Sequence, residues 1–315
     1  MEDILNVSTL QVPGFADDLA RSWRVHSAAT SGDIPAEARN VRALVTSGTN
    51  GATEALLAQL PKLEFIANVG VGYDAIAVPA AVARGIRISN TPDVLTDDAA
   101  DLALALMIMA GRRLAIGDRE VRGGGWKGPT SPLGTKVAGK KLGILGLGRI
   151  GGAIARRAAA MDMEISYTNR RKADTPYRYI PDILTLAKEN DFLVLAASAG
   201  PDAKHIVNRA VLEALGPKGI LINIARGSLV DEAELTAALQ DGRLGGAALD
   251  VFEHEPKVPE ALRSIEHVVL SPHVGSATSE TRIAMGKLAM DNLAAFFAGK
   301  PLLTEVPESI AARKG

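Results

Sequence analysis

The sequence has no cysteine among its 315 residues. Disulfide bonds, thiolate metal sites and cysteine nucleophiles are therefore excluded, and no metal site is predicted. The chain also has almost no excess of charge of either sign, since its formal net charge is −1. We therefore expect no general attraction to nucleic acid or to an anionic membrane surface.

Long apolar runs are absent as well. The most apolar stretch covers residues 102–110, whereas a membrane-spanning helix needs about 20 apolar residues. No secretory signal peptide is recognisable at the N-terminus, so a reducing, cytoplasmic location is expected. What remains is the composition of an ordinary globular protein, with 47 % hydrophobic and 23 % charged residues. A chain of 315 residues is long enough for two hydrophobic cores.

Short apolar runs alternate with helical patterns through most of the chain. In the first part, strands are predicted at residues 4–9, 24–26, 43–46, 64–68 and 87–89, and helices at 16–22, 52–59 and 78–84. In the second part, strands are predicted at residues 141–145, 163–168, 192–196, 220–224, 247–251 and 268–270. This alternation is typical of parallel sheets covered by helices on both faces. The sequence therefore predicts an α/β fold with two Rossmann-like lobes.

Two long helices mark the connections between the lobes. Asp97 or Asp98 is expected to cap the first, which runs through Arg113, and Ser279 is expected to cap the last. The segment Gly-Lys-Pro at residues 299–301 should end that last helix.

The tail from Leu302 is too short for a domain of its own and is expected to return to the first lobe. We predict a smaller, flavodoxin-like substrate domain of residues 1–97 plus 288–315. A doubly wound dinucleotide-binding domain of residues 98–287 would be inserted into it. Ligands of such sheets bind outside the carboxyl ends of the strands, so chemistry is expected in a cleft between the lobes.

The segment Gly-Leu-Gly-Arg-Ile-Gly at residues 146–151 is the most informative motif. It follows the apolar run at 141–145 and precedes an alanine-rich helical run, which is the context that a dinucleotide fingerprint requires. Gly146 would permit a tight turn, Gly148 would let a pyrophosphate approach, and Gly151 would let helix and strand pack closely. The helix N-terminus would offer its N–H groups to the phosphates. A glycine-rich turn without a ligand is the alternative.

The end of the next strand bears on the choice of cofactor. NAD sites usually carry Asp or Glu there for the ribose 2′-hydroxyl, but this strand ends in Asn169, Arg170 and Arg171. A guanidinium binds phosphate in a bidentate manner. The sequence therefore favours NADP(H) over NAD(H), with a solvated basic loop continuing into Lys172 as the alternative.

Three polar residues follow strands of the second lobe, namely Arg226, Glu255 and His273. Carboxyl ends of parallel strands share one edge of a sheet, so these side chains should lie on the cofactor's side. They supply a fixed cation for a carboxylate, a proton carrier, and an acid that stabilises the carrier's protonated form. Hydride chemistry on a 2-keto acid needs this set. Taken singly, each could be a surface ion pair, a structural histidine or part of a solvated stretch.

Several strings carry a family resemblance. They are Gly-Leu-Gly-Arg-Ile-Gly at 146–151, Ile-Asn-Ile-Ala-Arg-Gly at 222–227, Gly-Gly-Ala-Ala-Leu-Asp-Val-Phe-Glu-His-Glu-Pro at 245–256, Ser-Pro-His-Val-Gly-Ser at 271–276, Asn-Val-Gly-Val-Gly-Tyr-Asp at 68–74 and Asn-Thr-Pro-Asp-Val-Leu-Thr at 90–96. Over nearly its whole length the chain resembles the D-isomer-specific 2-hydroxyacid dehydrogenases. Within that family it looks most like the short NADP-using glyoxylate, hydroxypyruvate and hydroxyphenylpyruvate reductases.

The resemblance implies roles for the residues around the substrate. Arg226 would hold the carboxylate and carbonyl oxygen, and His273 would donate the proton in reduction. Glu255 would pair with His273 and keep it protonated. Val71 and Gly72 would offer backbone N–H groups to the substrate carboxylate, which suits a glycine loop.

The resemblance also implies cofactor contacts. Asp250 would bind the nicotinamide carboxamide, Thr96 would lie near the cofactor at the hinge, and residues 147–150 would cradle the pyrophosphate. The full predicted cofactor set is Thr96, Gly146, Leu147, Gly148, Arg149, Ile150, Gly151, Asn169, Arg170, Arg171, Ile224, Ala225, Arg226, Asp250 and His273. The loop at 197–201 matches the family only loosely, so no contact is assigned there.

A homodimer is also implied, because in the family the helix from Asp98 and an arm, here residues 119–136, pack on a second subunit. Trp126 would be buried at that contact, or alternatively would be a core residue of its own chain.

The predicted function is NADPH-dependent reduction of small 2-keto acids, glyoxylate and hydroxypyruvate above all, to D-2-hydroxy acids. A 3-phosphoglycerate dehydrogenase is an alternative, although its chains are often longer and its phosphate would want cations near Val71. Formate oxidation is disfavoured because the residue before His273 does not match that branch. A non-enzymatic alternative is a dinucleotide-sensing scaffold of the corepressor kind, since fold does not settle function.

Overall fold

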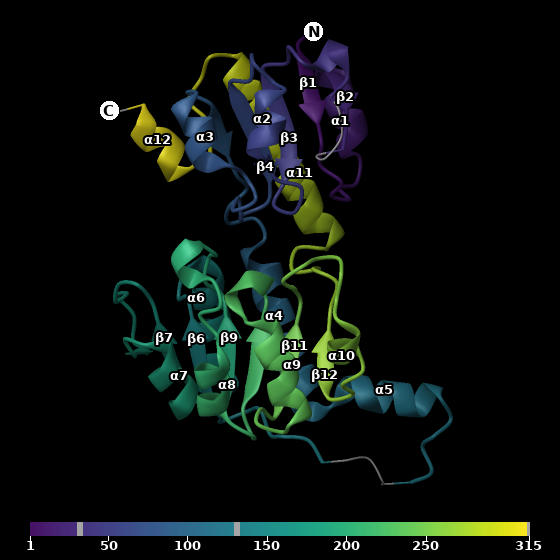
Figure 1. The fold of residues 1–315 in the computed structure, drawn as a ribbon, viewed down its shortest axis with the longest axis vertical. Coiled ribbons are helices and arrows are strands. Elements are labelled where there is room, and N and C mark those ends of the chain that lie inside the picture. Colours follow the sequence, from purple (N-terminus) through teal and green to yellow (C-terminus); the bar gives the residue numbers. More distant parts are fainter. Residues whose placement is uncertain (30–33, 129–132, 314–315) are drawn as a thin grey trace. The chain divides into compact units, whose positions relative to one another are not determined.

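The computed structural model describes residues 1–29, 34–128 and 133–313. The chain divides into two compact units (Figure 1). Unit 1 comprises Met1–Leu95 and Ser276–Gly315, and unit 2 comprises Thr96–Gly275. Among the described residues, no helix has both the length and the apolar character that a membrane span requires.

Unit 1 is built on a parallel sheet with the strand order β2-β1-β3-β4-β5, which is the flavodoxin-like order. The strands are β1 (Asp3–Asn6), β2 (Arg24–Ser27), β3 (Ala43–Ser47), β4 (Phe65–Val69) and β5 (Arg87–Ser89). The helices are α1 (Phe15–Ser22), α2 (Glu54–Ala58), α3 (Val78–Ala83), α11 (Ser279–Phe297) and α12 (Pro307–Ala312).

The central strands of unit 1 show why this sequence forms a covered parallel sheet. Every residue of β3 and β4 is buried, as expected for strands with helices on both faces. Helix α11 packs on β4, and Phe296 stacks on Phe65 with ring centroids 5.0 Å apart. β1 is shorter than the predicted strand, because the Asn6 side chain accepts a hydrogen bond from the Ser8 N–H (3.0 Å) and turns the chain.

Unit 2 has a longer parallel sheet with the order β12-β11-β10-β9-β6-β7-β8. The strands are β6 (Lys141–Leu145), β7 (Glu164–Thr168), β8 (Arg178–Tyr179), β9 (Phe192–Leu195), β10 (Ile220–Asn223), β11 (Gly246–Leu249) and β12 (Val268–Leu270). β6 lies between β7 and β9, so the winding direction reverses next to β6. Ligands of doubly wound sheets bind at such a switch point. The predicted α/β class with two Rossmann-like lobes is confirmed.

Two helical layers cover this sheet. The helices are α4 (Thr96–Arg112), α5 (Leu114–Arg122), α6 (Arg149–Ala159), α7 (Ile183–Glu189), α8 (Arg209–Leu215), α9 (Glu232–Gln240) and α10 (Glu260–Arg263). α4 packs with α6 and against β10 and β11, whereas α7, α8 and α9 form the opposite layer. Each layer has its own apolar core.

Two of the predicted helix caps are wrong. α4 begins at Thr96, so Asp97 and Asp98 lie in its first turn. Negative charge there stabilises the helix by interacting with the positive end of its dipole. α11 is capped by Thr278, one residue before the predicted Ser279, and the Thr278 side chain accepts from the Thr281 N–H (3.2 Å).

The compact units divide the chain at residues other than the predicted 97/98 and 287/288. All of α11 belongs to unit 1, because it packs along β4 and against α1. The tail after Leu302 also lies in unit 1, where α12 packs on α3 and β5.

Candidate active site

The glycine turn after β6 has the shape of a phosphate-binding loop. Gly146 has φ 96°, and a Cβ there would lie 2.5 Å from the Ala197 nitrogen. A Cβ on Gly151 would lie 2.0 Å from the Gly146 oxygen. At Gly148, by contrast, a Cβ would meet no described atom within 4 Å. No described side chain caps the start of α6 at Gly148, so the helix N-terminus can receive an anion there. This loop fits a dinucleotide pyrophosphate.

Asn169 joins this turn to the tip of β7. Its Oδ1 accepts a hydrogen bond from the Leu147 N–H (2.7 Å), and its backbone oxygen accepts one from the Tyr179 hydroxyl (3.2 Å). Because the carboxamide oxygen is engaged, the amide nitrogen is the group that remains to donate to a ligand. Arg170 and Arg171 follow and are exposed. The end of β7 thus presents donors rather than a carboxylate.

Arg226 lies in a turn after β10 that is held by a buried asparagine. Asn223 is 1 % exposed. Its Oδ1 accepts from the Ala225 N–H (3.0 Å), and its Nδ2 donates to the Arg226 backbone oxygen (2.9 Å). A Cβ on Gly227 would lie 1.9 Å from the carbonyl carbon of Phe252. The glycine therefore lets the turn after β10 lie directly against the turn after β11.

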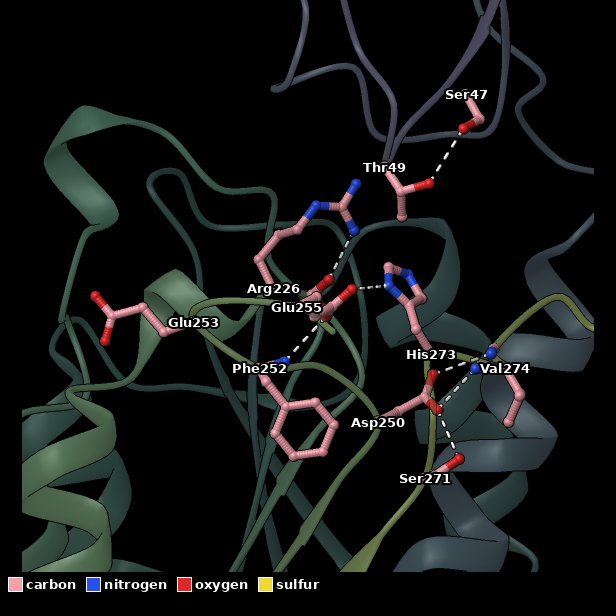
Figure 2. Close-up of polar contacts among 12 residues, drawn as sticks. Ser47, Thr49, Arg226, Asp250, Phe252, Glu253, Glu255, Ser271, His273 and Val274 are labelled. Carbon is pink, nitrogen blue, oxygen red and sulfur yellow. Dashed lines mark hydrogen bonds and ion pairs between the residues drawn. The ribbon is translucent and has the colours of Figure 1, made fainter. Parts of the chain in front are cut away.

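Glu255 and His273 form the central pair of the site. Glu255 Oε2 lies 2.7 Å from His273 Nδ1, and Glu255 Oε1 accepts from the Phe252 N–H (3.0 Å). Figure 2 shows the Glu255 carboxylate between the Arg226 side chain and the His273 ring. Burial acts to raise the pKa of Glu255, but the hydrogen bond and charge of His273, the Phe252 N–H and the charge of Arg226 outweigh it. The pKa of Glu255 is therefore below its ordinary value.

Asp250 holds the loop that carries His273. Its Oδ1 accepts from the Ser271 hydroxyl (2.7 Å) and the Val274 N–H (2.8 Å), and its Oδ2 accepts from the Gly275 N–H (3.0 Å). These contacts surround the carboxylate in Figure 2. The backbone oxygen of Asp250 also accepts from the His273 N–H (2.8 Å). His273 has φ 55°, and this network supports that backbone conformation.

Most of the other predicted residues also lie in unit 2. Leu147, Ile150 and Ile224 are half-buried apolar residues beside the core, Ala225 is buried, Arg149 is exposed in the first turn of α6, and half-buried Thr96 begins α4. Unit 2 thus brings the predicted residues after β6, β7, β10, β11 and β12 to the carboxyl edge of one sheet. Val71 and Gly72 belong to unit 1 and follow β4. No group of three or more His, Asp or Glu residues suitable for a metal occurs among the described residues.

Several supporting residues were missed by sequence reasoning. Asn223 is one of them, and its signal was a polar residue inside the apolar string Ile-Asn-Ile-Ala. Glu232 is another: it accepts from the Glu253 N–H (3.2 Å), and burial raises its pKa. Asn68 and Asn90 hold the loop after β4. These side chains bind backbone, and sequence spacing does not reveal such contacts.

The predicted dimerisation arm lies partly within the described residues. Positions 129–132 of the arm fall outside them. Trp126 is 64 % exposed, so the alternative of an intrachain core residue is wrong. Leu133 and Val121 are also exposed, and Figure 1 shows α5 projecting from unit 2.

A doubly wound sheet with this glycine turn and an Arg, Glu and His at its carboxyl edge is the architecture of a dinucleotide-dependent oxidoreductase. Comparison with known proteins specifies the class further. Residues 104–275 match the family described as "D-isomer specific 2-hydroxyacid dehydrogenase, NAD binding domain".

Relatives match over most of the chain. A hydroxyphenylpyruvate reductase of Plectranthus scutellarioides is 52 % identical over 86 % of this chain and 87 % of its own. A 2-ketogluconate reductase of Gluconobacter oxydans is 42 % identical over 96 % of this chain and 98 % of its own. The crystal structure of an NADPH-dependent glyoxylate/hydroxypyruvate reductase of Sinorhizobium meliloti, in complex with NADP and malonate, has a TM-score of 0.93 at 40 % identity, covering 98 % of this chain and 97 % of its own.

The chain therefore belongs to the D-isomer-specific 2-hydroxyacid dehydrogenase family. The predicted family, the oxidoreductase class and the dinucleotide-binding domain are confirmed.

Proposed function

We propose that this protein reduces small 2-keto acids, with glyoxylate and hydroxypyruvate as the leading substrates, to D-2-hydroxy acids, using NADPH in preference to NADH. The observation that carries the proposal is the pair of Glu255 and His273, 2.7 Å apart, beside Arg226 at the carboxyl edge of the unit 2 sheet. The relatives named as glyoxylate and hydroxypyruvate reductases support the choice of substrates.

The side chains of unit 2 divide the reaction between them. Arg226 is the cation that holds the carboxylate and polarises the carbonyl oxygen. When bound, NADPH supplies the hydride that adds to the carbonyl carbon. Because His273 Nδ1 faces Glu255, the proton for the new alkoxide comes from Nε2. Glu255 stabilises the charged imidazole that must donate it.

Unit 1 supplies the second half of carboxylate recognition in this proposal. The N–H groups of Val71 and Gly72, in the loop after β4, would donate to the substrate carboxylate, as backbone nests do for anions. Thr96, Ile224, Ala225 and Asp250 are proposed to contact the cofactor on its nicotinamide side.

The preference for NADPH rests on the end of β7. Asn169 is fixed by its bond from the Leu147 N–H (2.7 Å), which leaves its amide nitrogen for a 2′-phosphate. Arg170 and Arg171 are exposed beside it and supply the positive charge that a phosphate binds. The relative solved with NADP is named NADPH-dependent, which supports this assignment.

A homodimer is proposed from the exposed apolar side chains on and after α5. Val121, Trp126 and Leu133 are 59 %, 64 % and 93 % exposed in the single chain. Exposed apolar side chains gathered in one segment are typical of an interaction surface. Sedimentation of the unmodified protein and of Trp126→Ala tests this point, and a cytoplasmic location remains a proposal for fractionation to test.

A panel of 2-keto acids tests the substrate. Turnover of glyoxylate, hydroxypyruvate, 2-ketogluconate, hydroxyphenylpyruvate and 3-phosphohydroxypyruvate should be measured as kcat/KM with NADPH and with NADH. We expect glyoxylate or hydroxypyruvate to lead with NADPH. Highest activity on the phosphorylated acid would favour the phosphoglycerate-type alternative. Cofactor binding without turnover of any acid would favour the scaffold.

A further inference from the structure

Two asparagines hold the backbone carbonyls of the loop after β4. Asn68 Nδ2 donates to the Gly70 oxygen (3.0 Å) and to the Gly72 oxygen (3.1 Å). Asn90 Nδ2 donates to the Val71 oxygen between them (2.9 Å). All three carbonyls of residues 70–72 are therefore bound by side chains of unit 1.

This arrangement determines where the N–H groups of the loop point. The peptide bonds that join residues 70–73 are trans, and in a trans peptide the N–H points opposite to the preceding C=O. Each of the N–H groups of Val71, Gly72 and Tyr73 therefore points away from the asparagine that binds the carbonyl before it. Successive backbone N–H groups in a turn can together bind an anion.

Asn68 is held in this orientation at a cost. Its side chain is fully buried, and its Oδ1 has no hydrogen-bond partner among the described residues. An unsatisfied buried acceptor is unfavourable and calls for an explanation. The two carbonyls that its Nδ2 serves provide one, since the amide could not turn to satisfy its oxygen without releasing both.

Asn90 is itself fixed from the C-terminal segment. Its backbone N–H donates to the Thr304 oxygen (3.2 Å), and the Thr304 hydroxyl donates to the Asn90 oxygen (2.6 Å). Asn292 of α11 is buried and donates to the Thr304 hydroxyl oxygen (2.9 Å). A continuous series of hydrogen bonds thus runs from α11 through Thr304 and Asn90 to the Val71 carbonyl.

We propose that Asn68 and Asn90 are positioning residues that shape residues 70–73 into a carboxylate-binding nest, with the Tyr73 N–H as a third donor beside those of Val71 and Gly72. The inference rests on the proposed function, because it takes the carboxylate of the keto acid as the anion. It assigns substrate affinity, and not proton or hydride transfer, to these asparagines.

Asn90→Ala and Asn90→Asp test the proposal together. Ala removes the donor without adding charge, and Asp keeps the shape but cannot donate to the Val71 carbonyl. We expect both to raise the KM for glyoxylate and the Kd of oxamate, a non-reducible analogue, about tenfold. This is the effect of losing one hydrogen bond from a displaced loop N–H group to the charged carboxylate of the ligand. The Kd of NADPH and the kcat should stay within about twofold, since the asparagine acts only through the loop. Oxamate binding is read from the fluorescence of the NADPH complex.

Asn208→Asp is the matched control. Asn208 caps α8, and its Oδ1 accepts from the N–H groups of Ala210 and Val211. Asp accepts equally well there, so this variant adds the same charge without breaking either of these hydrogen bonds. Unchanged KM and Kd are expected for it.

The outcomes separate this inference from the function on which it rests. If the unmodified protein binds oxamate and both Asn90 variants bind it equally well, the positioning role is wrong. The same holds if Asn90→Asp weakens binding but Asn90→Ala does not, because charge repulsion then explains the effect. If the unmodified protein neither binds oxamate nor reduces a keto acid, the proposed function itself fails.

Discussion

The two sheets of this molecule carry different chemistry at their carboxyl ends. In unit 2 the loops that follow the strands carry ionisable side chains, and Glu255 and His273 face each other at 2.7 Å. In unit 1 the loop after β4 is held by Asn68 and Asn90 through its backbone carbonyls. In the proposed reaction the same parallel architecture therefore offers ionisable side chains in one unit and backbone N–H groups in the other. A proton can be moved by the first set, whereas the second is suited to holding a fixed anion.

This difference suggests a division of labour. The side chains of unit 2 should govern the rate of the chemical step, and the loop of unit 1 should govern affinity for the substrate carboxylate. The following predictions test that division, from the largest expected effect to the smallest.

Replacement of His273 by alanine should have the largest effect. General acid catalysis is worth roughly 10²–10⁴-fold in rate, so kcat for glyoxylate reduction should fall by about that factor. NADPH binding, measured by fluorescence titration, should persist, because Asp250 anchors the surrounding loop through Ser271 and Val274. If kcat falls by less than about tenfold, His273 is not the proton donor.

Arg226→Lys should be damaging although the charge is kept. Lys is a point charge and cannot present a planar fork to carboxylate and carbonyl oxygen. We expect kcat/KM to fall about tenfold or more, since a bidentate charge-assisted contact is strong. Preservation within about threefold would rule out the bidentate role. Arg243→Lys, at a site paired with Glu213 and Asp241, is the control.

The cofactor preference should reverse when the end of β7 is changed. Asn169→Asp keeps an oxygen that can accept from the Leu147 N–H. Combined with Arg170→Ala and Arg171→Ala, it replaces the hydrogen-bond donors to the 2′-phosphate by a carboxylate. NADPH should be preferred about tenfold or more in the unmodified protein, and NADH in the triple variant. The test is kcat/KM with both cofactors. Equal use of NADH and NADPH by the unmodified protein would show that the two arginines belong to a solvated loop and do not bind the 2′-phosphate.

Glu255→Gln should shift the pH profile and leave the acid side nearly intact. The pKa of Glu255 is depressed, so its carboxylate is ionised and stabilises the charged imidazole at every pH above that lowered pKa, and this stabilisation is lost only as pH falls through it. At higher pH, loss of this anion lets the imidazole give up its proton sooner. The upper limb of the reductive profile should move to lower pH. An unmoved upper limb would exclude the Glu255–His273 coupling from catalysis.

The sequence predicts the functional side chains of unit 2 better than the loop of unit 1 that Asn68 and Asn90 hold through its backbone carbonyls. Arg226, Glu255 and His273 are recognisable because each is polar and follows an apolar strand by a few residues. Asn68 and Asn90 lie in different strand–loop segments, and their common target, residues 70–72, appears only when β4 and β5 pair.

The sequence also does not predict which residue caps a helix when two neighbouring residues are both suitable. Thr278 and Ser279 are both good helix caps, and in the structure Thr278 is the cap, while the Thr281 hydroxyl in the first turn donates to the Val94 oxygen (3.5 Å). β1, by contrast, ends at a local hydrogen bond from the Ser8 N–H to the Asn6 side chain.

The most direct test of the division of labour is a comparison of His273→Ala with Asn90→Ala, in which kcat and KM for glyoxylate are measured with saturating NADPH. The account predicts that His273→Ala loses kcat by about 10²-fold or more and that Asn90→Ala keeps kcat while its KM rises about tenfold. If both variants change the same parameter, or if the unmodified protein does not reduce glyoxylate, the two sheets do not divide the reaction in this way.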